Sequence, residues 1–200
     1  SNAGSNSTRG LFFAGTPSGY HNVVDYITIG STGNATDFGD VTNASDGGAG
    51  FASTTRAIYG GGQAGGSNRY NNIDYFTIDT TGNATDFGNL SANKENVNGC
   101  SSNTRGIFAG GYTGSATLDV IEYITIGSTG NATDFGDLTA ATSNMNGCTS
   151  NQTTAVMHRT GDTIETVTIA STGNASDFGD LTVSRSNRTC ATGNLHGGIG

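Results

Sequence analysis

The 200-residue sequence is poor in charge and in rigid residues: charged side chains make up 12%, and there is one Pro and no Trp. Eight Lys and Arg against sixteen Asp and Glu give a formal net charge of −8. Because nucleic acids are bound mainly through cationic side chains, this balance argues against a nucleic-acid partner. The sequence also lacks an apolar run near the roughly 18 residues of a membrane-spanning helix, so we expect no membrane insertion.

A polar sequence with 33 Gly often fails to bury enough apolar surface to fold. Here, runs of β-branched and aromatic residues recur at fixed places, which is typical of strands. The runs are VVDYITI from Val23, IDYFTI from Ile73 and VIEYITI from Val120. The pattern therefore predicts an all-β fold.

One phrase occurs four times: STGNATDFGD from Ser31, TTGNATDFGN from Thr80, STGNATDFGD from Ser128 and STGNASDFGD from Ser171. Its phenylalanines are 49, 48 and 43 residues apart, a period typical of repeats that each form one small sheet. In the third repeat we predict strands at 105–111, 118–126, 132–138 and around 145–150, with a hairpin turn at 128–131. Four antiparallel strands per repeat predict one blade of a β-propeller.

We expect a single propeller domain at residues 8–200, preceded by an expression-tag remainder and disordered lead at 1–7. The expected repeats are about 8–53, 54–102, 103–151 and 152–200. The first repeat begins with the residue pattern of outer strands, whereas the stretch 184–194 has the small residues of an innermost strand. We therefore predict that 184–194 pairs with the strand at 9–15 and closes a four-bladed ring.

The motifs RGIFAGG, VIEYITIGSTGNATDFGDLT and NGCTSN, with their counterparts, resemble kelch repeats. They are most similar to kelch-like arrays in predicted tail or virion proteins of marine phages. The resemblance implies a kelch-like β-propeller with a structural or host-attachment role, in the virion or outside the cell. The sequence departs from the kelch pattern in lacking Trp, and its fourth repeat, TAVMHRTGDTIETVTI, lacks the paired glycines.

Several recurrent polar residues have a structural and a functional interpretation. The cysteines Cys100, Cys148 and Cys190 fall at one repeat position, taken by Phe51 in the first repeat, and are expected to be buried packing residues. Neither they nor the three His have metal-ligand spacing, so we predict no metal and no cofactor.

The repeated phrase contains two further patterns. Its Asn-Ala-Thr/Ser triplets match the N-glycosylation pattern, although an Asn after Gly is also typical of hairpin turns. Its Thr and Asp oxygens could form a calcium loop, but their spacing favours structural hydrogen bonding. The triplets begin at Asn34, Asn83, Asn131 and Asn174.

Arg9, Arg56 and Arg105 recur at the start of one strand, and an acidic residue recurs on the next. This repetition indicates ion pairs or contacts with backbone carbonyls that hold each blade. The acidic residues are Asp25, Asp74, Glu122 and Glu165. Thr154 stands where the fourth Arg is expected, so either the contact is dispensable there or Arg159 replaces it.

No nucleophile with a base, no carboxylate pair and no metal-ligand set is apparent, and His21, His158 and His196 lie in different repeats. We therefore predict a non-catalytic protein. A propeller gathers distant loops around its axis, so an enzyme remains the less favoured alternative.

The loops between the second and third strands vary in sequence, whereas the STGN turns hardly change, and variable loops on a constant scaffold are typical of recognition. The candidate ligand-binding residues in these loops are Tyr20, His21, Arg69, Tyr70 and Tyr112. Their rings and donors suit a host-surface glycan or another virion protein. The alternative from another class is a structural assembly module with no ligand of its own.

Overall fold

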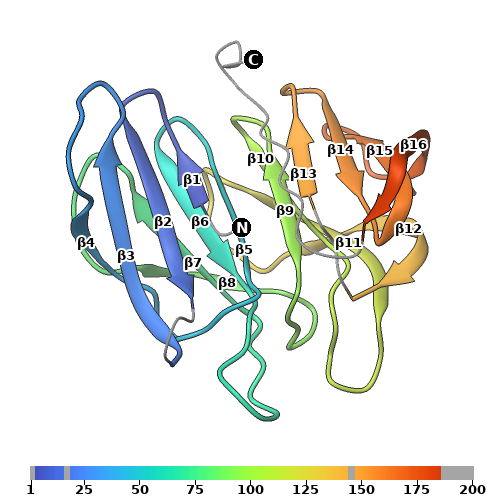
Figure 1. Ribbon diagram of the computed structural model, residues 1–200, viewed down its shortest axis with the longest axis horizontal. Helices are drawn as coiled ribbons and strands as arrows, with labels where there is room; N and C mark the ends of the chain where they lie inside the picture. Colours follow the sequence, from blue (N-terminus) through green and yellow to red (C-terminus); the bar gives the residue numbers. More distant parts are fainter. Residues whose placement is uncertain (1–2, 16–18, 144–146, 186–200) are drawn as a thin grey trace.

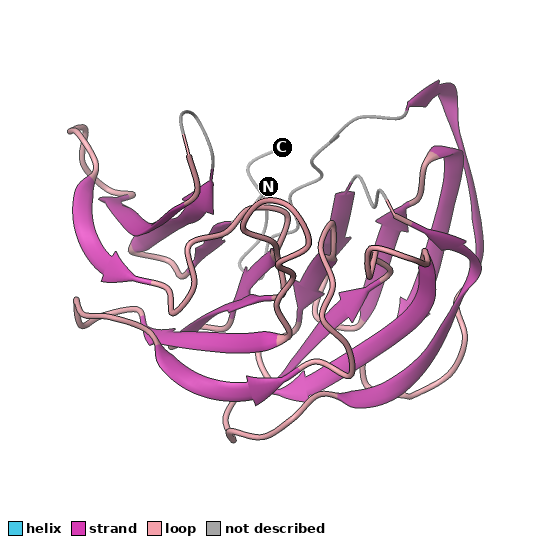
Figure 2. Cartoon of the chain, turned by 90° about the horizontal axis from the view of Figure 1, so that it is seen from below, coloured by secondary structure: helices cyan, strands magenta, loops and turns pink. Residues whose placement is uncertain are grey.

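The computed structural model describes residues 3–15, 19–143 and 147–185. In this part of the chain the regular structure is entirely β-strand (Figure 2). The strands form four antiparallel four-stranded sheets arranged as a four-bladed β-propeller (Figure 1). The predicted all-β fold, blade number and number of strands per blade are thus confirmed.

Each blade runs in chain order across one sheet. Blade 1 contains β1 (Ala3–Ser5), β2 (Arg9–Gly15), β3 (His21–Thr28) and β4 (Thr36–Asp40). Blade 2 contains β5 (Ala49–Ala52), β6 (Arg56–Gly60), β7 (Asn72–Thr77) and β8 (Thr85–Asn89). Blade 3 contains β9 (Asn98–Ser101), β10 (Arg105–Ala109), β11 (Leu118–Thr125) and β12 (Thr133–Thr142). Blade 4 contains β13 (Gly147–Ser150), β14 (Thr154–His158), β15 (Gly161–Thr168) and β16 (Ser176–Arg185).

The hydrophobic core consists of three layers, one between each pair of consecutive blades. The phenylalanine of the repeated phrase lies in each layer: Phe38, Phe87 and Phe135 are each 2% exposed. The central strands have apolar residues on both faces because a blade packs on each side of them, as β11 does through Ile121 and Ile124. This stacking explains why the strand sequences do not alternate simply between apolar and polar residues.

The repeated phrase forms the seam between blades. The turn of the copy in one blade packs against the DFG strand of the copy in the preceding blade. Between blades 2 and 1, the N–H of Gly82 donates to the carbonyl of Phe38 at 2.7 Å. The same bond joins Gly130 to Phe87 and Gly173 to Phe135, also at 2.7 Å. The phrase recurs almost unchanged because each copy contributes to both sides of this contact.

The innermost strand of blade 1 comes from the start of the sequence. β1 pairs with β2 through Ala3 and Phe12, Gly4 and Leu11, and Ser5 and Gly10. β1 thus occupies, along residues 10–12, the position that was predicted for 184–194, and β3 occupies the other edge of β2. The first two residues of that stretch end β16, where Arg185 pairs with Gly161. Residues 3–5 also form a strand where a disordered lead was expected, and 186–194 lie outside the described residues.

Cys100 is buried in the core and Cys148 packs partly buried against it, in line with their predicted packing role, but the two are also bonded to each other. Cys100 in β9 and Cys148 in β13 form a disulfide, with their Cα atoms 5.7 Å apart. They can pair because the equivalent inner strands of neighbouring blades run side by side near the axis. The bond covalently joins blades 3 and 4, while Cys190 lies outside the described residues.

Candidate functional site

The variable loops of blades 2 and 3 lie on the same face as the connectors between blades. Gln63 forms bridges with both Asp46 and Arg69, and Tyr112 forms bridges with both Glu95 and Thr117. Asp46 and Glu95 belong to the connectors that follow β4 and β8. We call the surface formed by residues 19–21, 61–71, 93–96 and 110–117 the loop face.

Arg69 and Tyr112, two of the predicted site residues, lie together on the loop face. The Arg69 guanidinium carbon is 5.0 Å from the centre of the Tyr112 ring, and Arg69 Nε is 2.9 Å from Glu95 Oε1. The Arg69 and Glu95 side chains are only 12% and 7% exposed. The charge of Arg69 is therefore neutralised by Glu95, and its side chain is held between Glu95 and Tyr112. Arg69 thus positions the loop.

Tyr112 and the loop that follows it are fixed by short-range contacts. The Tyr112 hydroxyl donates to the carbonyl of Gly114 at 2.8 Å. Gly114 has a positive φ of 98°, and a Cβ there would lie 2.6 Å from Arg69 Nη1. Glycine is favoured at this position by its positive φ, and the guanidinium packs in the space beside it.

Tyr20 of blade 1 extends the loop face towards blade 2. Its side chain is 38% exposed, and its ring lies against Gly65, where a Cβ would be 3.1 Å from Tyr20 Cε2. Tyr70 is half-buried, and its backbone N–H donates to the Gly62 carbonyl at 2.9 Å. The structure thus connects Tyr20, the 61–71 loop and Tyr112 in one series across three blades.

His21, the fifth predicted residue, begins β3 and is exposed. Its carbonyl accepts a hydrogen bond from Ser45 N at 3.2 Å. Within the described part of the chain, the contacts that join Arg69, Glu95 and Tyr112 do not include it.

The sequence reasoning missed the connector residues Lys94 and Glu95. Lys94 is the only lysine of the sequence; its side chain is fully buried and its Nζ bonds the Glu122 carboxylate. A single lysine beside a glutamate in a charge-poor sequence was the available signal. The repeat pattern does not indicate it, because Ser45 and Thr142 stand at the position of Lys94 in the other connectors.

Beneath the loop face, Tyr59 is buried and bonds Ser45, with Tyr59 Oη 3.0 Å from Ser45 Oγ. Burial raises the pKa of Tyr59 to about 12. The hydroxyl therefore remains protonated and serves as a structural group under the connector.

Three of the four recurrent acidic residues, Asp74, Glu122 and Glu165, connect blades at buried positions, whereas Asp25 is exposed. Asp74 accepts hydrogen bonds from Thr42 N at 2.7 Å and Thr42 Oγ1 at 2.8 Å, across the first seam. Burial raises the pKa of Asp74 above its ordinary value. Glu122 likewise accepts from Ser91 N at 2.7 Å, and this contact places its carboxylate at the next seam.

The recurrent arginines contact backbone carbonyls, which decides between the two interpretations of their repetition. Each Nη1 donates to a carbonyl of the next blade, and each guanidinium stacks on a tyrosine of its own blade. The acceptors are Ile78 for Arg9 at 2.8 Å, Ile126 for Arg56 at 2.9 Å and Ile169 for Arg105 at 2.8 Å. Arg159 does not replace the missing contact, because it pairs with Glu165 at 3.2 Å.

The Asn residues of the repeated phrase also form hydrogen bonds between neighbouring blades. The side-chain oxygens of Asn83, Asn131 and Asn174 accept from backbone N–H groups of the preceding blade at 3.0 to 3.1 Å. This geometry supports the turn interpretation over glycosylation for these three. Among the described residues, no three His, Cys, Asp or Glu side chains lie close enough to hold a metal ion.

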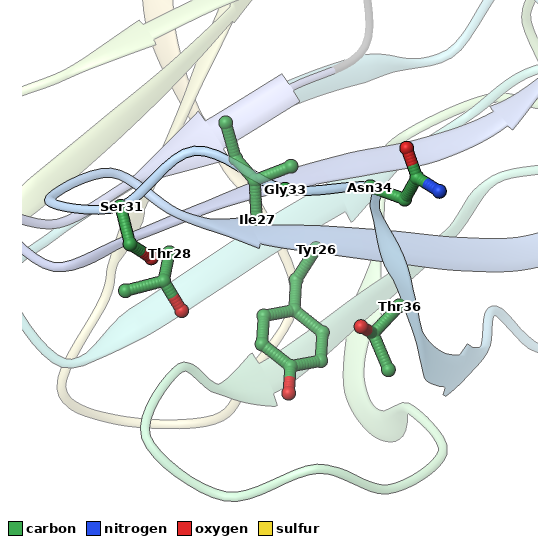
Figure 3. A pocket seen from close by; sticks show the side chains of 7 residues that line it. All are labelled: Tyr26, Ile27, Thr28, Ser31, Gly33, Asn34 and Thr36. Carbon is green, nitrogen blue, oxygen red and sulfur yellow. The ribbon is translucent and has the colours of Figure 1, made fainter.

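A hollow of about 90 Å³ lies on the opposite face, beside the repeated turn of blade 1 (Figure 3). It is lined by Tyr26, Ile27, Thr28, Ser31, Gly33, Asn34 and Thr36. These residues offer hydroxyl, amide and backbone groups without a carboxylate, an imidazole or a thiol. The hollow therefore presents hydrogen-bonding groups but no general base.

No protein-family model matches the chain, and no curated protein matches it. The described residues contain no helix long and apolar enough to cross a membrane. What the structure shows is the four-bladed β-propeller, and the kelch-like and phage resemblance is carried by the sequence motifs alone.

Proposed function

We propose that this protein is a non-catalytic binding module that recognises a host-surface glycan or another virion protein through its loop face. The observation that supports this proposal is the ordered Arg69, Tyr112 and Glu95 cluster among loops that differ between blades. The kelch-like motifs add the context of a phage tail or virion.

The loop face has the properties of a preformed recognition surface. Aromatic rings such as Tyr20 and Tyr112 offer flat apolar faces to sugars or to apolar side chains, with a polar group at one end. The Arg69–Glu95 pair holds the loops in place before binding, which reduces the entropy that a ligand must overcome. The repeated turns of the opposite face are instead used in docking blade on blade.

Binding to host cells and to a glycan array tests the proposal. We expect Tyr20→Ala, and the double variant Arg69→Ala with Tyr70→Ala, to weaken binding about tenfold or more, as loss of an aromatic anchor does. Thr81→Ala, an exposed change in a repeated turn, is the matched control and should bind as the wild type does. Unchanged binding by both loop-face variants would refute the proposal.

The alternative of a structural assembly module is favoured by a different observation, the uncovered sides of blades 1 and 4 described below. Saturable binding of a sugar by the wild type would separate the two functions. A module that only assembles should show none.

A further inference from the structure

The first and last blades each have one side that no blade covers. In blades 2, 3 and 4, the side turned to the preceding blade is buried. We call the same side of blade 1 the leading face; it contains Phe12, Asp25, Ile27, Ile29 and the turn at 31–35. In blades 1, 2 and 3, the side turned to the following blade is buried. We call the same side of blade 4 the trailing face; it contains Phe178, Gly179, Asp180, Leu181 and Thr182.

Exposure separates these faces from their internal counterparts. Phe12 and Ile29 are each 50% exposed, and Phe178 is 60% exposed. The residues at equivalent positions of the other blades are all 2% exposed or less. Those counterparts are Tyr59, Phe108 and Met157 for Phe12; Ile78, Ile126 and Ile169 for Ile29; and Phe38, Phe87 and Phe135 for Phe178. Exposed large apolar residues gathered on one side typically mark an interaction surface.

The two faces also carry the two halves of one hydrogen-bond pattern. At the first internal seam, Gly82 N donates to Phe38 O at 2.7 Å, Ala84 N donates to Asp40 O at 2.8 Å, and Asp40 N donates to Asn83 Oδ1 at 3.1 Å. The leading face has the turn half of this set, in Gly33, Asn34 and Ala35. The trailing face has the strand half, in Phe178 and Asp180, and in the described part of the chain neither half forms these bonds.

The shape of the internal seam is preserved at both ends. Inside the molecule, the DFG glycine lets two backbones meet, since a Cβ on Gly39 would lie 2.4 Å from the Gly82 carbonyl oxygen. Gly179 has a similar positive φ, 140° against 145° for Gly39, but no atom of the described part of the chain lies within 4 Å of its Cβ position. Gly33, the leading counterpart of Gly82, lines the hollow beside the turn (Figure 3).

Polar side chains outside the turn also have counterparts on the leading and trailing faces. At the first seam the buried carboxylate of Asp74 accepts from Thr42. The leading counterpart of Asp74 is Asp25, the trailing counterpart of Thr42 is Thr182, and both are exposed. One contact has no counterpart: Thr154 stands in place of the arginine that reaches a carbonyl of the next blade at the internal seams.

We infer that the trailing face of one copy docks on the leading face of a second copy, and reciprocally. A second copy fits because it supplies both complementary halves with the repeat geometry of the internal seams. Figure 1 shows β1–β4 and β13–β16 at opposite ends of the fan, and no buried cluster among the described residues joins these two blades. Two copies of four blades close into a ring of eight, within the roughly four to eight blades of known propellers.

Light scattering after size-exclusion chromatography, over a concentration series, tests this inference. The wild type should have twice the mass of one chain. Phe178→Asp on the trailing face and Ile29→Asp on the leading face should each have the mass of one chain. Both side chains are exposed within a single copy, so the variants should keep the circular dichroism and thermal unfolding of a folded monomer.

Val183→Asp is the matched control. Val183 is 61% exposed on the same strand as Phe178, and its blade 3 counterpart, Ala140, is exposed although blade 4 covers that side of blade 3. This variant should remain a dimer. A monomeric wild type, or a Phe178→Asp variant that is still a dimer, would overturn the inference.

Mixing the two monomeric variants tests whether unlike faces meet. Phe178→Asp retains an intact leading face and Ile29→Asp an intact trailing face, so an equimolar mixture should contain a pair joined by one junction. Affinity-tagged Phe178→Asp should capture Ile29→Asp and should not capture an untagged copy of itself. Self-capture would mean that like faces meet, and no capture in the mixture would exclude head-to-tail docking. These outcomes do not depend on any glycan, so they can fail independently of the proposed function.

Discussion

Glycine at the end of the DFG tripeptide allows two blades to touch through their backbones at each of the three internal seams. A Cβ on Gly88 would lie 2.3 Å from the Gly130 carbonyl oxygen, which is far inside contact distance. The turn glycine of blade 2, Gly82, also has a positive φ, but nothing lies within 4 Å of its Cβ position. Backbone strain and close approach are therefore separable at these two positions.

We expect Gly88→Ala to destabilise the protein more than Gly82→Ala, by about 2 kcal/mol, the usual cost of forcing a methyl group into packed structure. Both changes strain a similar φ, 148° for Gly88 and 155° for Gly82, so their difference reports the close approach. Urea unfolding of the two variants measures it. Equal losses would show that the seam can open to admit a methyl group.

The buried carboxylate of Asp74 makes stability depend on pH. The native pKa of Asp74 is raised by burial above the value of 3.8 that it has in an unfolded chain. Between these two values the native state holds more protons than the unfolded state, so the free energy of unfolding falls as pH rises. Above the native pKa, the ionised Asp74 continues to cost stability.

We therefore expect the wild type to lose stability relative to Asp74→Asn as pH rises from 3.8 through the raised native pKa. Other carboxylates are present in both proteins and cancel in the comparison. Urea unfolding at a series of pH values measures the difference. Parallel curves for the two proteins would contradict a raised pKa at this position.

Inner strands bring equivalent positions of neighbouring blades together. β9 and β13 run side by side, and Cys100 and Cys148 join them across a sequence separation of 48 residues. A cross-link that closes a loop of this length restricts the unfolded chain. The fourth blade, which lacks the paired glycines and an arginine contact, is thus tied covalently to the third.

We expect a reductant to lower the thermal midpoint of the wild type. The free energy of unfolding should fall by about 2–4 kcal/mol, the usual effect of removing a native disulfide. Cys148→Ala should unfold at the lower temperature whether or not reductant is present. Differential scanning calorimetry and intact mass after thiol labelling provide the measurements. Labelling of Cys100 in the non-reduced wild type would show that the bond is absent.

The whole molecule is a row of blades in which each internal blade is covered on two sides and each terminal blade on one. Repeat proteins of this kind gain stability mainly at the interfaces between neighbours. Head-to-tail docking would give blades 1 and 4 their second neighbour. It would also cover Phe12, Ile29 and Phe178.

The thermal midpoint of the wild type should consequently rise with protein concentration, because association stabilises only the folded state. The midpoint of Phe178→Asp should be independent of concentration. Calorimetry over a hundredfold range of concentration provides the comparison. A constant midpoint for the wild type would mean that docking contributes nothing to folding stability.

The sequence alone determined the fold class, the number of blades and the position of the central strands. Local propensity and a repeated phrase are sufficient for this, because each blade repeats one pattern of strand and turn residues. The variable loops were also apparent from the sequence, and the structure places Arg69 beside Tyr112.

Only the tertiary structure decided which segments meet across blades. The inner strand of blade 1 proved to be β1, three residues with no clear strand signal, since pairing with β2 and packing at the axis define it. The Cys100–Cys148 bond, the Arg69–Glu95 pair and the burial of Lys94 likewise join residues far apart in the chain. Such contacts depend on the angle and spacing between neighbouring sheets, which a repeat pattern read within one blade does not contain.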